Sequence, residues 1–201
     1  MSDSIAIGKL GVGATIKEGF SIGMKNIGPI LVNVLLWVLT CWIPYLNVGT
    51  TIGLTVGIVS KASKGEAIPF TEIFDSKYRK YIGEFLLTQG LMGMGVVIGL
   101  VFFIIPGIVI GLAWSLALLL VIDKGKNPAE ALTISNNCTY GNKWRMFFVF
   151  FLICFAISIL STIFALLGTI GYLLIFVLML FAMFVVIGLQ ASIYKQLTAN
   201  V

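Results

Sequence analysis

The sequence predicts an all-α protein: a polytopic transmembrane bundle of six helices, arranged as three hairpins, with short amphipathic interfacial helices on the cytoplasmic side. All 21 charged residues lie outside three runs, 26–60, 85–122 and 146–194, which contain 35, 38 and 49 residues. A helix needs about 20 apolar residues to cross a bilayer core. Each run therefore has room for two crossings. The composition agrees, since 10% of the residues are charged, against roughly 25% in an ordinary soluble domain.

The chain is expected to form one membrane domain, 1–201, with its polar segments 1–25, 61–84, 123–145 and 195–201 on one side. Three hairpins return the chain to the same side each time, which leaves the opposite face without charge. The formal net charge is +5, and the positive-inside bias makes the charged face cytoplasmic, with both termini inside. Such a face favours anionic lipid headgroups, and not nucleic acid, as partners. The first 25 residues have no apolar core of the signal-peptide type, so no cleaved leader is expected.

Each run carries a turn signal near its middle: Pro44 in the first, Pro106 followed by Gly107 in the second, and Gly168 in the third. Proline fixes φ and glycine readily adopts positive φ, so the hairpin turns are predicted at these residues. The second arms of the first two hairpins contain 16 residues each. That length is marginal for a crossing, and a re-entrant hairpin is the alternative.

Small residues recur at every fourth position in these two short arms, where they share one helix face. They are Gly49, Gly53 and Gly57 in the first arm and Gly107, Gly111 and Ser115 in the second. Such faces let a neighbouring backbone approach closely in lipid. Packing within one chain is the favoured interpretation. Contact between copies and a pore or substrate path are the alternatives.

The segments that precede the hairpins are predicted to be short helices lying in the headgroup plane, with apolar stripes toward lipid. In the first segment the stripe is Ile16, Phe20, Met24 and Ile27. In the second, the basic residues Lys77, Arg79 and Lys80 point toward lipid phosphates, and Asp75 is placed to pair with Arg79. A docking surface for a partner protein is the alternative for this face.

The third segment has the clearest local pattern. Asn127 is placed as an N-cap, Pro128 at the first helical position and Glu130 at the third, which together form a capping box. The helix is expected to stop at Gly141. Lys143, Trp144 and Arg145 then form an interfacial anchor where the next hairpin enters the membrane.

The sequence offers little reactive chemistry. It contains no histidine and no ionisable acid or base within the apolar runs, and its three cysteines are scattered. We therefore predict no catalytic site, no metal site and no cofactor. Glu84 and Asp123 could meet at a hairpin base and pair with Lys80 or Lys124, as a headgroup or Mg²⁺ site or simply as helix-end charges. Asn33 and Gln89 could hydrogen-bond to each other and join two hairpins.

The segment from Ile105 to Phe147 carries a resemblance. An Ile105-Pro106-Gly107 turn is followed by Ala131-Leu132-Thr133-Ile134-Ser135 and then by Gly141-Asn142-Lys143-Trp144. This pattern resembles the YciC-like uncharacterised bacterial integral membrane family, and it is similar to the membrane domain attached to some glycerophosphoryl diester phosphodiesterases. The resemblance covers about 45 of the 201 residues. It implies a bacterial inner-membrane protein without an established catalytic site, and no phosphodiesterase activity is carried over.

These observations favour a non-enzymatic membrane protein that acts as an assembly, scaffold or accessory module. Its expected partners are anionic membrane lipids and either a second copy or another membrane protein. The alternative is a small transporter, channel or lipid-handling protein with a neutral pathway between the hairpins.

Overall fold

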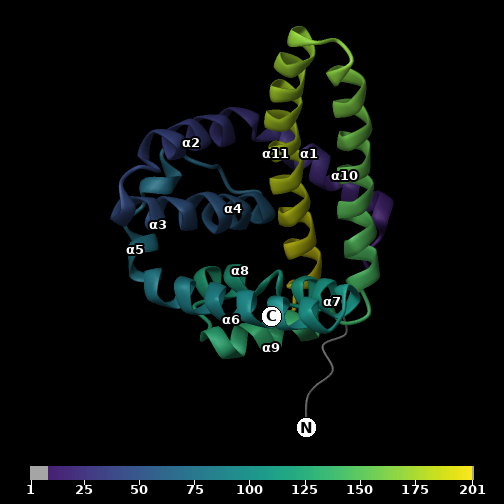
Figure 1. The fold of residues 1–201 in the computed structure, drawn as a ribbon. Coiled ribbons are helices and arrows are strands. Elements are labelled where there is room, and N and C mark those ends of the chain that lie inside the picture. The colour runs from purple at the N-terminus through teal and green to yellow at the C-terminus, as the bar shows by residue number, and fades with distance from the viewer. Residues whose placement is uncertain (1–8, 201) are drawn as a thin grey trace.

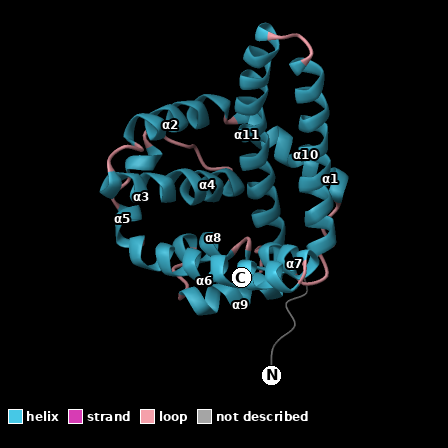
Figure 2. Ribbon diagram, viewed as in Figure 1, coloured by secondary structure: helices cyan, strands magenta, loops and turns pink. Residues whose placement is uncertain are grey.

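The computed structural model describes residues 9–200, and this part of the chain is helical without any strand (Figure 2). The predicted all-α class is thus confirmed. Four helices are long and apolar enough to cross a membrane: Ile82–Phe102, Ile104–Asp123, Lys143–Ala165 and Thr169–Leu197. A fifth span results if the bent pair Val12–Lys25 and Ile27–Thr40 is counted as one. Length and composition therefore indicate a multi-pass membrane protein.

The N-terminal part contains α1 (Val12–Lys25) and α2 (Ile27–Thr40), which are bent by 71° relative to each other. The chain then turns into α3 (Pro44–Ile52), where Pro44 occupies a first-turn position that needs no N–H donor. A five-residue π-helical segment, Gly53–Gly57, joins α3 to α4 (Ile58–Lys64). With 14 residues, α2 is about 21 Å long, which is short for a complete crossing.

The middle part begins with a 3₁₀ turn, Glu72–Phe74, and α5 (Lys77–Lys80). The second hairpin consists of α6 (Ile82–Phe102), α7 (Ile104–Trp114) and α8 (Ala117–Asp123). Its turn is at Phe103, which is extended at φ −164° and ψ 151°. The turn predicted at Pro106 and Gly107 is therefore misplaced, because both residues lie inside α7. Proline is tolerated in a first helical turn, so it did not mark the turn itself.

The C-terminal part contains α9 (Pro128–Thr139), α10 (Lys143–Ala165) and α11 (Thr169–Leu197). Gly168 lies in the turn between α10 and α11 with a φ of 62°. Gly141, at φ 77°, lies in the turn after α9. Both have a positive φ, which glycine adopts without strain.

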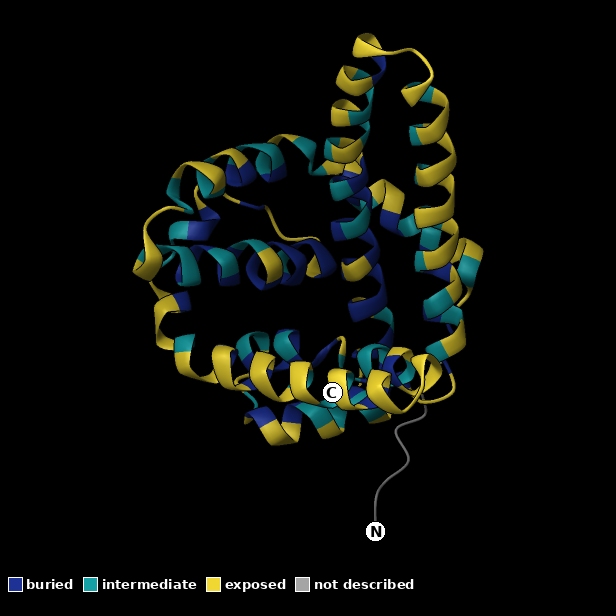
Figure 3. Cartoon of the chain, viewed as in Figure 1, coloured by how far each residue is buried: buried dark blue, intermediate teal, exposed yellow. Residues whose placement is uncertain are grey.

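The hairpins do not stand side by side. In Figure 1 the α10–α11 hairpin is upright, whereas α2, α3 and α6 run across it. The main core forms where α1, α4 and α8 meet the C-terminal half of α11, with Leu120, Leu189 and Ile193 almost fully buried. Toward its tip the α10–α11 hairpin is largely exposed (Figure 3). Burial thus concentrates at one end of α11 and leaves the other end for lipid.

Of the three segments expected as surface helices, the first keeps part of its predicted stripe exposed and the other two pack within the chain. The first is α1, which buries Thr15, Gly19 and Gly23 and leaves Phe20 and Met24 of the predicted stripe exposed, as a lipid-facing stripe requires. The second is split into the 3₁₀ turn and the four-residue α5, because the chain bends to pack against α3 and the π segment. The third, α9, packs against α7 and α8. In the second and third segments, intrachain packing thus replaces an isolated surface helix.

Candidate functional site

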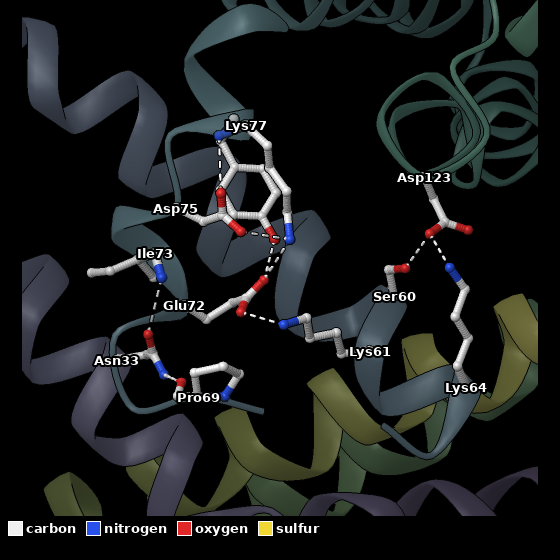
Figure 4. Close-up of polar contacts among 11 residues, drawn as sticks. Asn33, Ser60, Lys61, Lys64, Pro69, Glu72, Ile73, Asp75, Lys77 and Asp123 are labelled. Carbon is white, nitrogen blue, oxygen red and sulfur yellow. Dashed lines mark hydrogen bonds and ion pairs between the residues drawn. The ribbon is translucent and has the colours of Figure 1, made fainter. Parts of the chain in front are cut away.

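Buried carboxylates organise the polar interior where α4, α8 and α11 end, and Figure 4 shows two of the clusters. The Glu72 cluster consists of Lys61, Glu72, Lys77 and Tyr78. The Asp123 cluster consists of Ser60, Lys64, Asp123 and Tyr194. Because Ser60 and Lys61 are consecutive, α4 contributes to both clusters and holds them side by side.

Glu72 is 2% exposed and fully engaged. It accepts hydrogen bonds from Lys61 Nζ at 2.6 Å, from Lys77 Nζ at 3.1 Å and from the Tyr78 hydroxyl. Burial opposes ionisation of this carboxyl, but the three donors outweigh it and hold the Glu72 pKa below its ordinary value. Burial and the Glu72 charge raise the pKa of Tyr78, so its hydroxyl stays protonated as a donor.

The geometry of this cluster depends on Gly57 in the π segment. A Cβ at Gly57 would collide with the Tyr78 hydroxyl. The absence of a side chain therefore lets the Tyr78 ring lie against the helix with its hydroxyl at Glu72. Asp75 completes this region through Lys77, whose Nζ lies 2.9 Å from Asp75 Oδ2. The predicted pairing of Asp75 with Arg79 is wrong, since Lys77 takes that position.

Asp123, the last residue of α8, ties together three parts of the chain. Ser60 and Lys64 of α4 donate to its Oδ1, and the Tyr194 hydroxyl of α11 donates to its Oδ2 at 2.9 Å. Glu84, with which Asp123 was expected to meet, is instead exposed on α6. Asp123 thus braces helix ends from all three hairpins.

Asn33 performs a similar bracing role for α2. Its side-chain amide donates to the Pro69 carbonyl at 2.8 Å, and its Oδ1 accepts from the Ile73 N–H at 3.1 Å. These bonds fix the segment that carries Glu72. The predicted hydrogen bond to Gln89 is wrong, because Gln89 is exposed and Asn33 is satisfied by this segment.

A third cluster joins the two ends of the described chain. Glu18 of α1 accepts from Ser192 at 2.8 Å, Lys195 at 2.8 Å and Gln196 at 2.9 Å, all on α11. Each cluster includes one lysine from the end of a helix, since Lys61 and Lys64 lie in the last turn of α4 and Lys195 lies in the last turn of α11. Positive side chains there also compensate the negative ends of the helix dipoles.

Two openings adjoin the clusters. The smaller, of about 110 Å³, lies between the Glu72 and Asp123 clusters, and the larger, of about 360 Å³, lies between α1, α4 and α11. Charged residues around the smaller are Lys61, Lys64, Glu66, Lys77 and Asp123, and those around the larger are Glu18, Lys25, Lys64, Glu66 and Lys195. Each opening is therefore lined by both positively and negatively charged side chains. Residues 9–200 bring together no group of three or more His, Cys, Asp or Glu side chains that could hold a metal.

The predicted small-residue faces have neighbours in their own chain. A Cβ on Gly53 would lie 2.6 Å from Ile73 Cα, and one on Gly49 would lie 3.6 Å from Arg79 Cγ. A Cβ on Gly107 would lie 2.5 Å from Leu100 Cγ. The remaining two members of the second face are less enclosed. A Cβ added to Gly111 would have only Val96 Cγ2, at 3.8 Å, within 4 Å. Ser115 is exposed, and its hydroxyl donates to the Leu112 carbonyl one turn earlier.

Some of the predicted interfacial residues are exposed, and others form hydrogen bonds within the chain. Arg79, Lys80 and Trp144 are exposed, whereas Lys143 Nζ donates to Asn136 Oδ1 at 2.8 Å and Arg145 donates to the Leu10 carbonyl at 3.2 Å. At the start of α9, Asn127 accepts from the Ala129 N–H at 3.1 Å. Glu130 pairs with Lys126 at 3.0 Å on the exposed surface.

Two features were missed by sequence reasoning. Ser135 of α9 donates to the Ala113 carbonyl at 2.7 Å and accepts from the Leu116 N–H at 3.2 Å, which bridges the break between α7 and α8. Gly19 and Gly23 of α1 pack against α11. The four-residue spacing of Thr15, Gly19 and Gly23 was a readable signal for this contact.

No family model, no curated protein and no solved structure matches the chain.

Proposed function

We propose that this protein is a non-enzymatic integral membrane protein that self-associates as an assembly, scaffold or accessory module. One observation carries the proposal: one face of α6 that is not packed in the chain is apolar and lined with small residues. Gly83, Gly90 and Gly93 have no heavy atom within 4 Å of an added Cβ. Leu86, Leu87 and Met94 beside them are exposed. The carboxylates of Glu72 and Asp123, by contrast, are engaged in hydrogen bonds within the chain.

The test is the mass of the purified protein in a native-lipid nanodisc, by native mass spectrometry or mass photometry. A defined oligomer is expected. Gly93→Leu should reduce the oligomer fraction by about tenfold, because a bulky side chain separates closely packed helices. Gly13→Leu, also at an open position but on α1, serves as the matched control. A monomeric wild type, or equal effects of the two substitutions, would refute self-association through α6.

We also propose the finer topology: six crossings in a bacterial inner membrane, with the termini and the charged residues on the cytoplasmic side. The positive-inside bias and the YciC-like resemblance support this placement. In a variant that lacks the native cysteines, Tyr45→Cys, Phe103→Cys and Leu167→Cys place one thiol near each hairpin tip. Labelling of all three by an impermeant maleimide from the periplasmic side is expected. Protection of the first or second tip would identify a re-entrant hairpin.

A lipid-handling or small-solute transport function is the second candidate. It is favoured by the openings of about 110 and 360 Å³ beside the carboxylate clusters. If it is correct, proteoliposomes should show solute or lipid flux that Lys64→Gln reduces. The matched substitution Lys17→Gln, at an exposed site on α1, should leave that flux unchanged. Flux that is absent, or equal in both variants, would exclude a pathway through these openings.

A further inference from the structure

An apolar groove lies between α7 and α10, away from the carboxylate clusters. Its volume is about 130 Å³. Four aliphatic side chains of α7 form one wall, and the first turns of α10 form the other. The lining residues are Ile105, Ile108, Val109, Leu112, Lys143, Trp144 and Phe147. Lys143 is the one charged residue among them.

Both walls belong to helices that are long and apolar enough to cross a membrane. By length and composition, lipid is therefore the expected medium outside the groove. The apolar wall also continues along α10, since the Phe147 ring stacks on Phe151 at 5.7 Å and Phe151 stacks on Phe155 at 5.9 Å. An extended apolar molecule that enters the groove would thus have a continuous surface to follow.

The chemistry at Lys143 is suited to an anion. Its Nζ donates one hydrogen bond to Asn136 Oδ1, which leaves ammonium protons for a further acceptor. Lys143 is also the first residue of α10, where the helix dipole adds positive potential. Trp144 beside it is 59% exposed, and tryptophan at such a position favours the headgroup level of a bilayer.

We propose that the groove binds one anionic glycerophospholipid, with part of an acyl chain between α7 and α10 and the phosphate at Lys143. The size of the groove favours an acyl chain over a protein helix as its occupant. An apolar cavity of about 150 Å³ holds a benzene molecule, whereas a helix with its side chains is about 10 Å wide. This inference requires a membrane environment and is independent of self-association through α6.

The experiment compares lipid retention by native mass spectrometry after incubation with equal amounts of phosphatidylglycerol and phosphatidylcholine. One retained phosphatidylglycerol is expected for the wild type. Lys143→Gln should lower its retention about fivefold, in line with the usual contribution of one lysine near an anionic surface. Ile108→Trp should lower the retention of both lipids by filling the groove. Lys17→Gln and Ile98→Trp, exposed on other surfaces, are the matched controls.

Circular dichroism melts verify that each variant is folded. Quenching of Trp144 fluorescence by dibrominated phosphatidylglycerol gives an independent readout in a variant whose other tryptophans are replaced by phenylalanine. Equal retention of the two lipids, or equal losses in the Lys143 and Lys17 variants, would overturn the proposal in favour of annular lipid. A dimer that Ile108→Trp dissociates would overturn it in favour of a second copy in the groove.

Discussion

Gly188 of α11 lies against the backbone of Gly19 in α1 so closely that any side chain at position 188 would collide with the Gly19 carbonyl oxygen. Gly23 is equally constrained by the Phe184 carbonyl on the other helix. Glycines on both helices thus allow two backbones to meet, which is the contact that favours helix association in lipid. This crossing is the most extensive contact between any two elements of residues 9–200.

Alanine at Gly188 should therefore destabilise the protein. The added methyl group forces α1 and α11 apart, and overpacking of this kind typically costs about 1–3 kcal/mol. Thermal unfolding monitored by circular dichroism in detergent should show a lower midpoint for Gly188→Ala. Gly13→Ala, where an added Cβ meets nothing within 4 Å, is the control. Identical midpoints for wild type and Gly188→Ala would contradict the close crossing.

Gly53→Ala should also lower the unfolding midpoint, because its Cβ would lie 2.6 Å from the Ile73 backbone. The expected cost is again about 1–3 kcal/mol, and the oligomer mass should not change. Gly111→Ala is the matched case from the second glycine face, with its nearest neighbour at 3.8 Å. If Gly53→Ala instead left stability intact and altered only the oligomer, this face would be an interface between copies.

Ser135→Ala should weaken the junction of α7 and α8. The hydroxyl both donates to Ala113 and accepts from the buried Leu116 N–H, which would lose its partner. An unsatisfied buried group costs about 1–3 kcal/mol. Amide hydrogen exchange around Leu116 should accelerate. Ser115→Ala removes an exposed hydroxyl that bonds only within its own helix. Comparable exchange in the two variants would argue against a bridging role for Ser135.

Glu72 should make stability depend on pH. Its pKa is lower in the folded chain than the ordinary value of 4.5 because of the Lys61, Tyr78 and Lys77 donors, which outweigh burial. The ionised form therefore stabilises the fold fully above about pH 4.5, and this contribution is lost as pH falls through the folded pKa. The difference in unfolding midpoint between wild type and Glu72→Gln should be largest near neutrality and shrink in acid. A difference that stays constant from neutrality into acid would argue against an ionised Glu72 in the folded chain.

Hydropathy was sufficient to predict the helical class and the presence of several apolar helices of membrane-spanning length, because the cost of charge in lipid leaves a strong pattern in the sequence. Hydropathy could not reveal which parts of the chain pack against each helix. The face of Gly53 and Gly57 was recognised, but its neighbours Ile73 and Tyr78 come from a segment expected to lie on the membrane surface. Local geometry was equally hidden, since Pro106 is compatible with the first turn of a helix as well as with a hairpin turn.

The polar contacts were the least predictable part. Asp123 was recognised as a helix-end carboxylate, but its partners Ser60, Lys64 and Tyr194 are separated from it by 59 to 71 positions. No local period encodes such a distance. The same holds for Asn33. A side-chain amide within an apolar run requires a hydrogen-bond partner, but the sequence does not show which residue supplies it.

The pairing of α1 with α11 has a consequence for biosynthesis. A chain that emerges from the ribosome from its N-terminus makes α1 well before α11, its glycine-matched partner. Until α11 is made, the face formed by Thr15, Gly19 and Gly23 lacks this partner. Only a polypeptide that has been extended through α11 can close this contact and bring Tyr194 to Asp123. A ribosome that stalls before residue 188 would therefore release a product whose first helix stays uncovered, open to membrane quality-control proteases.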